Sequence, residues 1–338
     1  MMYQNKAFCG NMYKYKSSAH IILTESDAQK EVIMQDVLVR AFSLIMIIVL
    51  GFAIKKLGWV RKEDFGIFSK IVLKITLPCA IITSFNEVSI DQTMLVYVII
   101  GILCNFILGG VAILVGMKKG RKEQAFNIVN YGSYNIGAFT MPYISSFLGA
   151  SGVVIVSLFD LGNSFAAAGI NYSVAKSLAD KSSKISIKAI LKNMFTSVLF
   201  VTYIVMFIIR MLELSVPSPI LVFTSMAGSA NTFLAMLMIG IAFDINLDTS
   251  RLKNSFMGLL NRYLVSVAMA LVIYYLLPMP TIGKVVLSIV LFSPIASMAT
   301  GFTQEIGGDL ERSSFMNSLS IIFGIIIMTS LIAILPLS

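Results

Sequence analysis

The residues best suited to bind a small solute lie within residues 125–159, an apolar stretch without Asp, Glu, Lys, Arg or His. In a membrane, a polar cluster of this kind is tolerated where the backbone lines a cavity enclosed by protein. We therefore expect a discontinuous helix, with one half ending near residue 137 and the second beginning near residue 141. The candidate binding residues of this segment are Ser133, Asn135, Gly137 and Pro142.

Asn135 is the strongest candidate, because its side-chain amide both donates and accepts hydrogen bonds and can meet a carboxylate. The N–H groups at the start of the second half-helix, with the positive end of its dipole, would also favour an anion. Two alternatives stay open. Asn135 could instead cap the broken helix, and the whole segment could be a Pro-kinked span followed by a short loop.

A second interrupted stretch, residues 282–306, carries Pro294 in mid-span among small and hydroxyl residues. Ser293 and Ser297, like Ser133, are candidates for binding a solute. Alternatively, each hydroxyl bonds back to the carbonyl four residues earlier in its own helix. Two Pro-interrupted segments at corresponding places in a chain indicate a shared site near the middle of the bilayer.

Charged residues inside apolar segments are also candidates. Lys74 lies about 9 Å into its segment at ~1.5 Å per residue, so a buried ammonium there needs a partner, either Asp160 or a substrate carboxylate. Asp160, with Asn163 nearby, could hold a proton or a coupling cation, could pair structurally with Lys74, or could lie in water near the outer end of its span. Arg262 is predicted to snorkel to the interface.

Several kinds of chemistry are disfavoured. The one histidine, His20, lies in the polar N-terminal region together with Cys9, whereas Cys79 and Cys104 lie in apolar segments. This scattered set of three cysteines and one histidine forms neither a disulfide framework nor a metal site. The sequence has no phosphate-binding Gly-rich loop ending in Lys-Ser/Thr, no Gly-x-Ser-x-Gly and no His-Glu-x-x-His. We therefore expect a protein that is not an enzyme and uses no metal or cofactor.

The composition predicts an all-α polytopic membrane protein. The 338 residues are 57% hydrophobic and 13% charged, with a mean hydropathy of +0.87, far too apolar for a soluble domain. The net charge of +9 reflects basic loops that remain in the cytoplasm, and we expect no nucleic-acid partner.

Ten apolar segments are expected to span the membrane. Their approximate bounds are 38–54, 68–85, 93–115, 125–148, 152–175, 195–212, 220–243, 256–277, 282–306 and 315–335. The basic residues gather after the odd-numbered segments, which predicts that those loops are cytoplasmic and that both termini lie outside. These residues are Lys55, Lys56, Arg61, Lys62, Lys118, Lys119, Arg121, Lys122, Lys176, Lys181, Lys184, Lys188, Lys192, Arg251, Lys253 and Arg312.

The linker 176–193 divides the chain into two sets of five spans, residues 34–175 and 194–338. Because five is odd, the two halves must have opposite orientation, as in an inverted repeat. The fourth and ninth spans, which both carry a mid-span Pro, then correspond. Residues 1–33 read as a polar, disordered tail; alternatively, translation begins at Met34.

The motifs resemble those of the auxin efflux carrier family of secondary transporters, which includes plant PIN proteins and bacterial malate and malonate permeases. The sequence 135–142, Asn-Ile-Gly-Ala-Phe-Thr-Met-Pro, is similar to the family's Asn-x-Gly-x-x-Gly-x-Pro. Three further segments add to the resemblance, residues 76–78, 293–297 and 305–309. The resemblance covers about residues 34–338. Thr140 replaces a Gly of the pattern, and Asn231 lies where many members have a Pro.

The resemblance implies that spans four and nine cross near the midplane, with elevator-like alternating access, organic anions as substrates and a possible homodimer. We therefore expect a multi-pass protein of the cytoplasmic membrane that carries a small, malate-like mono- or dicarboxylate and uses Asn231 among its binding residues. An anion channel or a membrane sensor on the same scaffold is the alternative.

Overall fold

A computed structural model describes residues 34–180, 186–243 and 249–336. These residues form helices and connecting segments, with no strand among them. Seven helices are long and apolar enough to cross a bilayer, or eight if the bent pair Ile190–Thr196 and Val198–Met211 is one span. The prediction of an all-α, multi-pass membrane protein is therefore confirmed. The predicted tail 1–33 and the linker residues Lys181 and Lys184 lie outside the described residues.

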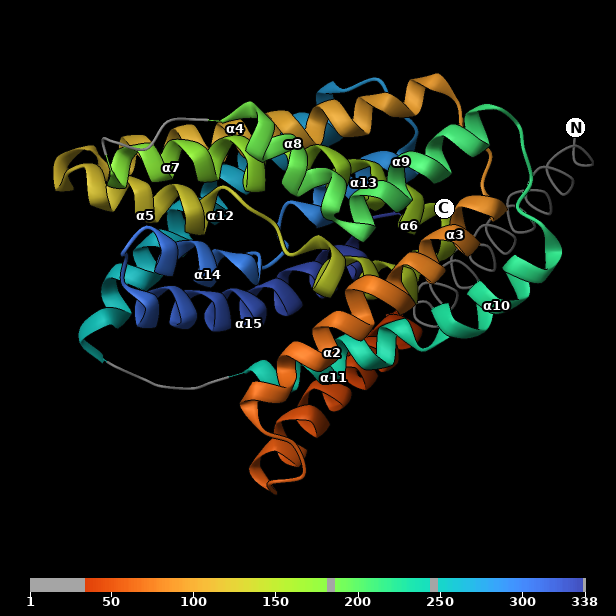
Figure 1. Ribbon diagram of the computed structural model, residues 1–338, viewed down its shortest axis with the longest axis horizontal. Helices are drawn as coiled ribbons and strands as arrows, with labels where there is room; N and C mark the ends of the chain where they lie inside the picture. Colours follow the sequence, from red (N-terminus) through yellow and green to blue (C-terminus); the bar gives the residue numbers. More distant parts are fainter. Residues whose placement is uncertain (1–33, 181–185, 244–248, 337–338) are drawn as a thin grey trace, which may run out of the picture.

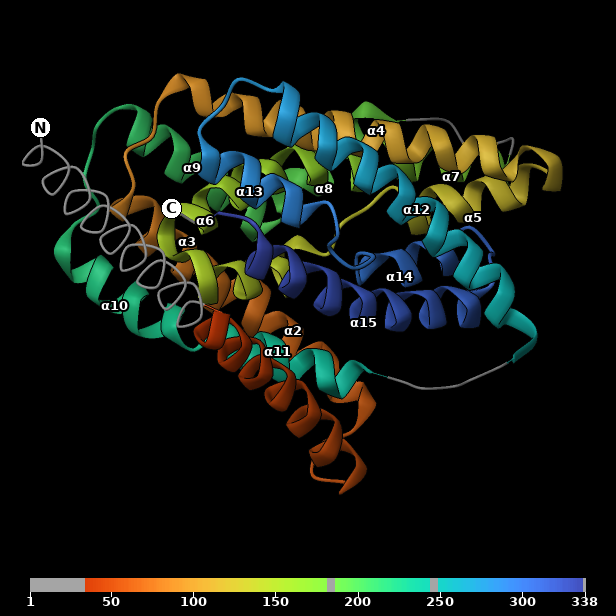
Figure 2. The same ribbon diagram turned by 180° about the vertical axis from the view of Figure 1, so that it is seen from behind.

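One group of helices forms a diagonal arm of the molecule, which we call the arm (Figures 1 and 2). α9 packs against α3 of this group. The arm consists of the first described helix (Met34–Lys56), α2 (Phe65–Ile71), the π-helical turn Val72–Thr76, α3 (Leu77–Glu87), α9 (Val198–Met211), α10 (Ser218–Ser229) and α11 (Asn231–Ala242).

Small residues allow two arm helices to approach closely. A Cβ added at Gly240 of α11 would lie 2.0 Å from the Ile48 carbonyl oxygen, and one added at Gly51 would lie 2.2 Å from that of Leu237. Only residues without a side chain fit at these positions, so α11 and the Met34–Lys56 helix are in direct backbone contact. This contact makes the arm a closely packed unit.

The remaining helices pack side by side and form what we call the body (Figures 1 and 2). α8 meets α9 at 77°. The body consists of α4 (Leu95–Gly116), α5 (Arg121–Tyr131), the π-helical turn Ile136–Thr140, α6 (Met141–Ser164), the π-helical turn Phe165–Asn171, α7 (Tyr172–Ala179), α8 (Ile187–Thr196), α12 (Thr249–Leu276), α13 (Thr281–Val290), α14 (Met298–Glu305) and α15 (Leu310–Ile334). Three 3-10 turns, Lys62–Asp64, Gln92–Met94 and Met117–Lys119, precede or end helices.

Interruptions divide several of the predicted spans. The fourth opens at residues 132–135, between α5 and the turn Ile136–Thr140, so the predicted opening at 137–141 is wrong by a few residues, because the polar cluster ends the first half-helix at Tyr131. The ninth opens between α13 and α14. At Gly149, φ is +53° and ψ −147°, a left-handed kink within α6 that only glycine adopts readily. This kink lies where the sequence predicts the end of the fourth span and the start of the fifth. The predicted linker 176–193 differs from expectation, because α8 begins within it.

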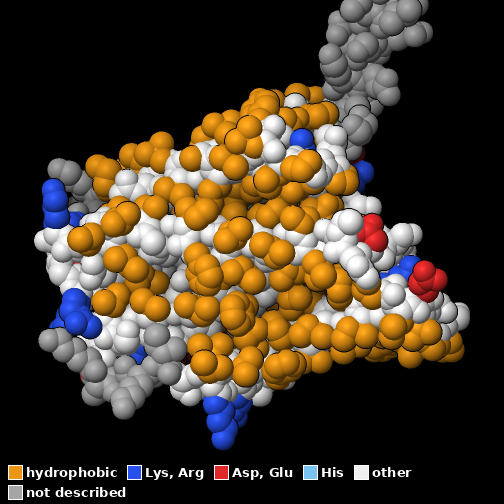
Figure 3. All heavy atoms as spheres, turned by 90° about the horizontal axis from the view of Figure 1, so that it is seen from above, with side chains coloured by type: hydrophobic (Ala, Val, Ile, Leu, Met, Phe, Trp, Pro, Cys, Tyr) orange, Lys and Arg blue, Asp and Glu red, His pale blue; other side chains and the backbone are white. Residues whose placement is uncertain are grey.

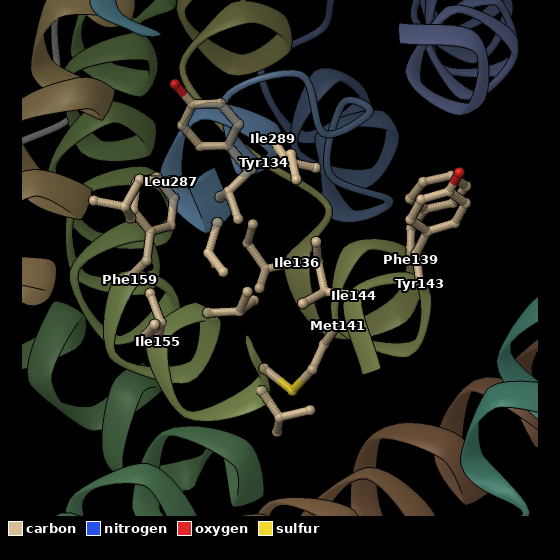
Figure 4. Packing of buried hydrophobic residues seen from close by; sticks show 14 of the residues in the cluster. Tyr134, Ile136, Phe139, Met141, Tyr143, Ile144, Ile155, Phe159, Leu287 and Ile289 are labelled. Carbon is tan, nitrogen blue, oxygen red and sulfur yellow. The ribbon is translucent and has the colours of Figure 1, made fainter. Parts of the chain in front are cut away.

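Apolar side chains cover most of the face seen in Figure 3, as expected for contact with lipid. On that face, several Lys and Arg side chains lie at the left and lower edges, others lie at the upper right and right, and the visible Asp and Glu lie toward the right. Inside the body, Ile136 and Ile144 belong to the same buried cluster as Leu287 and Ile289 of α13 (Figure 4). The interrupted helices therefore form the centre of the core.

Candidate functional site

The interruptions of the two broken helices are in direct contact. α5 ends at Tyr131 and α13 at Val290, and each is followed by a short non-helical segment. The backbone N–H of Asn135 donates a hydrogen bond to the Pro294 carbonyl oxygen at 2.8 Å. Segments separated by more than 150 positions in the chain thus meet through their backbones, as the sequence predicts.

Side chains reinforce this contact. The amide nitrogen of Asn135 donates to Ser297 Oγ at 3.0 Å. The hydroxyl of Thr140 donates to Ser293 Oγ at 2.7 Å and lies 3.0 Å from the Asn135 carbonyl oxygen. Thr140 is therefore a hydrogen-bonding partner across the two breaks.

Neighbouring helices satisfy backbone groups that the breaks release. Such groups are costly in a membrane unless they find partners. On the α13–α14 side, Ser266 Oγ donates to the Leu291 carbonyl at 2.8 Å, and the Ile295 N–H donates to Ser320 Oγ at 3.0 Å. On the α5 side, Asn171 donates to the Gly132 carbonyl at 3.0 Å. The open conformation is therefore built into the fold.

Arg262 binds both breaks at once. Its side chain is completely buried, and its guanidinium donates to the Tyr131 carbonyl and, at 3.1 Å, to the Ser293 carbonyl. The guanidinium carbon also lies 4.8 Å from the centre of the Tyr134 ring, within the range of a cation–π interaction.

The prediction that Arg262 snorkels to the interface is wrong, because α12 presents this side chain to the freed carbonyls in the body. The sequence contained a signal for a buried role of Arg262, the same one that pointed to Lys74. Each is a cation several residues inside an apolar segment, and such a residue is a functional candidate by default.

A cavity of about 460 Å³ adjoins the contact between the breaks. It lies between the arm, which contributes Leu73, Lys74 and Met238, and the body. The predicted site residues that line it are Lys74, Ser133, Asn135, Gly137, Asp160, Asn163 and Ser297. The sequence therefore predicted a set of residues that the fold brings together around one cavity.

Asp160 is held by hydrogen bonds within the cavity wall. Asn163 donates to its Oδ1 at 2.7 Å, and the Tyr203 hydroxyl donates to its Oδ2 at 2.9 Å. Only 6% of Asp160 is exposed, so the idea that it lies in water at the end of its span is wrong. Lys74 lines the same cavity with an exposed side chain, and no ion pair joins it to Asp160 in the described part of the chain.

Four predicted site residues support the breaks instead of lining the cavity. Ser293 and Pro294 make the contacts described above. Pro142 lies in α6, six residues after the helical segment begins at Ile136, and its missing N–H follows the π-helical turn Ile136–Thr140. Asn231 begins α11 and accepts a hydrogen bond from Thr76 Oγ1 at 3.0 Å, with both residues buried.

A second cavity of about 250 Å³ lies against the same contact. Asn135 and Ser297 line both cavities, together with Phe65 and Met238. The second cavity is otherwise lined by residues such as Thr300, Ser314 and Asn317. The Asn135–Ser297 pair therefore forms part of the wall of both cavities.

The first residues of the second half-helices lie on the larger cavity. These are Ile136 and Gly137 on one side and Ser297 and Met298 on the other. The first N–H groups of a helix have no partner within the helix and carry the positive end of its dipole. Together with the Lys74 ammonium, they give the cavity donors suited to an anion.

The fold and these breaks define a multi-pass α-helical membrane protein with a cavity, lined by both apolar and polar side chains, at the contact of two interrupted helices. Neither protein-family models nor curated proteins match this sequence.

Proposed function

We propose that the protein is a secondary transporter that moves a small organic anion, a mono- or dicarboxylate, across the cytoplasmic membrane by alternating access. The observation that carries the proposal is the contact between Asn135 and Pro294, next to a cavity with an ammonium and two helix N-termini. Interrupted helices that meet at a polar cavity are a recurrent architecture of transporter binding sites.

Ten spans in two oppositely oriented sets of five account best for the helices. The Gly149 kink divides the long segment Arg121–Ala179 into two spans, and α13 with α14 makes a broken ninth span. The repeat is supported by a second pair of interruptions, one in span two at the turn Val72–Thr76 and one in span seven before Asn231. They meet through Thr76 and Asn231, as the breaks of spans four and nine meet through Asn135 and Pro294.

In this proposal the body moves against the arm, and the solute travels with the broken helices. The cavity lies at the seam between the two units, which is where such a movement would open and close it. Both cavities reach residues at the predicted cytoplasmic ends of their segments, such as Phe65, Thr196 and Ser314. The described conformation is thus best read as inward-facing, with both termini outside and linker 176–193 in the cytoplasm.

A thermal-shift screen of the purified protein against small carboxylates tests the proposal. The screen is run with and without sodium and at two pH values, since Asp160 is the candidate for a coupling proton or cation. A ligand at about 100 times its Kd stabilises the folded state by about 2.7 kcal/mol, so a binder raises the unfolding temperature. The Asn135→Ala variant should lose this response. A wild-type protein that no carboxylate stabilises would contradict the proposal.

A further inference from the structure

Arg262 is a buried cation, and no acidic side chain among the described residues forms an ion pair with it. A guanidinium remains protonated in proteins, so the charge is permanent. A buried cation without an anionic partner is costly, and such groups in membrane segments mark function. The backbone carbonyls that it binds are dipoles and leave the full positive charge in place.

Tyr134 separates this charge from the larger cavity. Its ring lies 4.8 Å from the guanidinium carbon and Tyr134 is one of the cavity-lining residues. The charged side chains on the cavity wall itself are Lys74 and Asp160. With Arg262 behind the wall, two cations stand against one carboxylate, a balance of charges that favours a positive potential in the cavity even when Asp160 is ionised.

We propose that Arg262 is a positioning residue that makes the cavity selective for anions, through its charge and without touching the solute. By binding the Tyr131 carbonyl, it also holds the negative, C-terminal end of α5, and it binds the Ser293 carbonyl three residues after α13 ends. This inference rests on the proposed function, because selectivity matters only if the cavity takes up a solute.

The test measures the potential with reagents instead of a substrate. A single reporter cysteine, Ala168→Cys, lies on the cavity wall, in a full-length background without Cys9, Cys79 and Cys104. The modification rates by an anionic and by a cationic methanethiosulfonate of similar size are compared as a ratio. Ser151→Cys, at an exposed position outside the cavity, provides the reference ratio.

Arg262→Gln should lower the anionic-to-cationic ratio at the cavity cysteine by at least about tenfold. One unit charge across roughly 10 Å, at an effective dielectric constant of about 20–40, changes the rate of each reagent by about 4- to 16-fold, and the two rates change in opposite directions. Arg262→Lys keeps the positive charge but loses the planar guanidinium that binds two carbonyls, and it should retain most of the ratio. The reference ratio should not change. An unchanged ratio in Arg262→Gln, or an equal fall in Arg262→Lys, would overturn the inference and leave Arg262 a structural clamp.

A second variant keeps the test informative if Arg262→Gln does not fold. Lys74→Gln combined with Asp160→Asn removes both charged groups of the cavity wall and leaves Arg262 in place. The cavity cysteine should still prefer the anionic reagent over the reference position by several-fold. A ratio equal to the reference would overturn the inference. Because no substrate is used, this result is independent of whether the protein transports carboxylates.

Discussion

Asn135 and Ser297 join the two breaks and line both cavities. Asn135 has two separable roles. Its backbone N–H holds the Pro294 carbonyl, while its side chain bonds to Ser297 and faces the space where a solute would bind. A substitution of the side chain therefore tests binding while leaving the backbone contact intact.

We expect Asn135→Ala to reduce uptake of a labelled carboxylate into proteoliposomes by at least about tenfold, the size of one lost hydrogen bond to a charged group. The free energy of unfolding should fall by only about 1 kcal/mol. The matched control is Asn127→Ala, a buried asparagine on α5 that donates to the Ala112 carbonyl at 3.4 Å. Uptake in Asn135→Ala at the rate of Asn127→Ala would place the binding site elsewhere.

Lys74 offers the second test at the residue scale. We expect Lys74→Gln to weaken carboxylate affinity by about tenfold, because a hydrogen bond to a charged group is lost. The unfolding temperature without ligand should stay the same, since the side chain is exposed. Lys70→Gln, one helical turn earlier and also exposed, is the control and should bind normally. Equal affinities in the two variants would assign Lys74 to the surface.

Sequence reasoning found the residues of the cavity because Asn, Ser and Gly are unusual within an apolar segment. It missed contacts that depend on which faces of distant helices meet. The Thr140–Ser293 hydrogen bond and the Arg262 contacts join residues far apart in the chain, and no local pattern encodes such pairs. The charge of Arg262 was visible in the sequence, but the direction of its side chain was not.

At the scale of helices, the arm depends on close backbone contact between α11 and the Met34–Lys56 helix. We expect Gly240→Ala to destabilise the protein by about 1–3 kcal/mol, because its new methyl group would meet the Ile48 carbonyl oxygen at 2.0 Å. Thermal unfolding in detergent measures the change. Gly110→Ala is the control, since no atom lies within 4 Å of its added Cβ. Equal unfolding temperatures for the two variants would contradict the close contact.

A salt bridge joins the two proposed repeats within the body. Both terminal nitrogens of Arg312, on α15, lie 3.0 Å from the carboxylate oxygens of Glu123 on α5. The guanidinium also lies 4.2 Å from the centre of the Phe126 ring. The sequence predicted Arg312 only as one of the basic residues of a cytoplasmic loop. The two hydrogen bonds to Glu123 hold its side chain in one position.

We expect Arg312→Lys to destabilise the protein by about 1 kcal/mol, because lysine cannot form the two-pronged bond or stack in the same way. Thermal unfolding measures the loss. Lys119→Arg provides a control, since its 4.0 Å ion pair with the same Glu123 involves a side chain that is 57% exposed. An Arg312→Lys variant as stable as wild type would show that the fork contributes nothing.

Hydropathy predicted where the helices lie, because a bilayer imposes length and apolarity on each segment. The breaks of the fourth and ninth spans were predictable for the same reason, since polar clusters are rare there, although only the ninth contains its Pro within the break. The break before Asn231 and the π-helical turn Val72–Thr76 were not. The turn Val72–Thr76 has a local cause, because Pro78, two residues later, has no N–H to donate to it. The break before Asn231 contains neither Pro nor Gly. α8 was missed because its basic residues suggested a loop.

At the scale of the whole molecule, arm and body meet along the cavity, and the buried contacts between them are the ones that an alternating-access movement must exchange. Asp160 of the body bonds to Tyr203 of the arm helix α9, and Thr232 of α11 lies 3.5 Å from the Pro142 carbonyl. These bonds would break if the body slides. A rigid channel would keep them while solute passes.

The most direct measurement is the exchange of a labelled dicarboxylate in proteoliposomes, made in parallel with recording of current across a bilayer. The account predicts saturable uptake that is accelerated by unlabelled dicarboxylate on the opposite side, without steady conductance, since each binding event requires a movement. Uptake that never saturates, accompanied by continuous current, would contradict alternating access at the meeting point of the two broken helices.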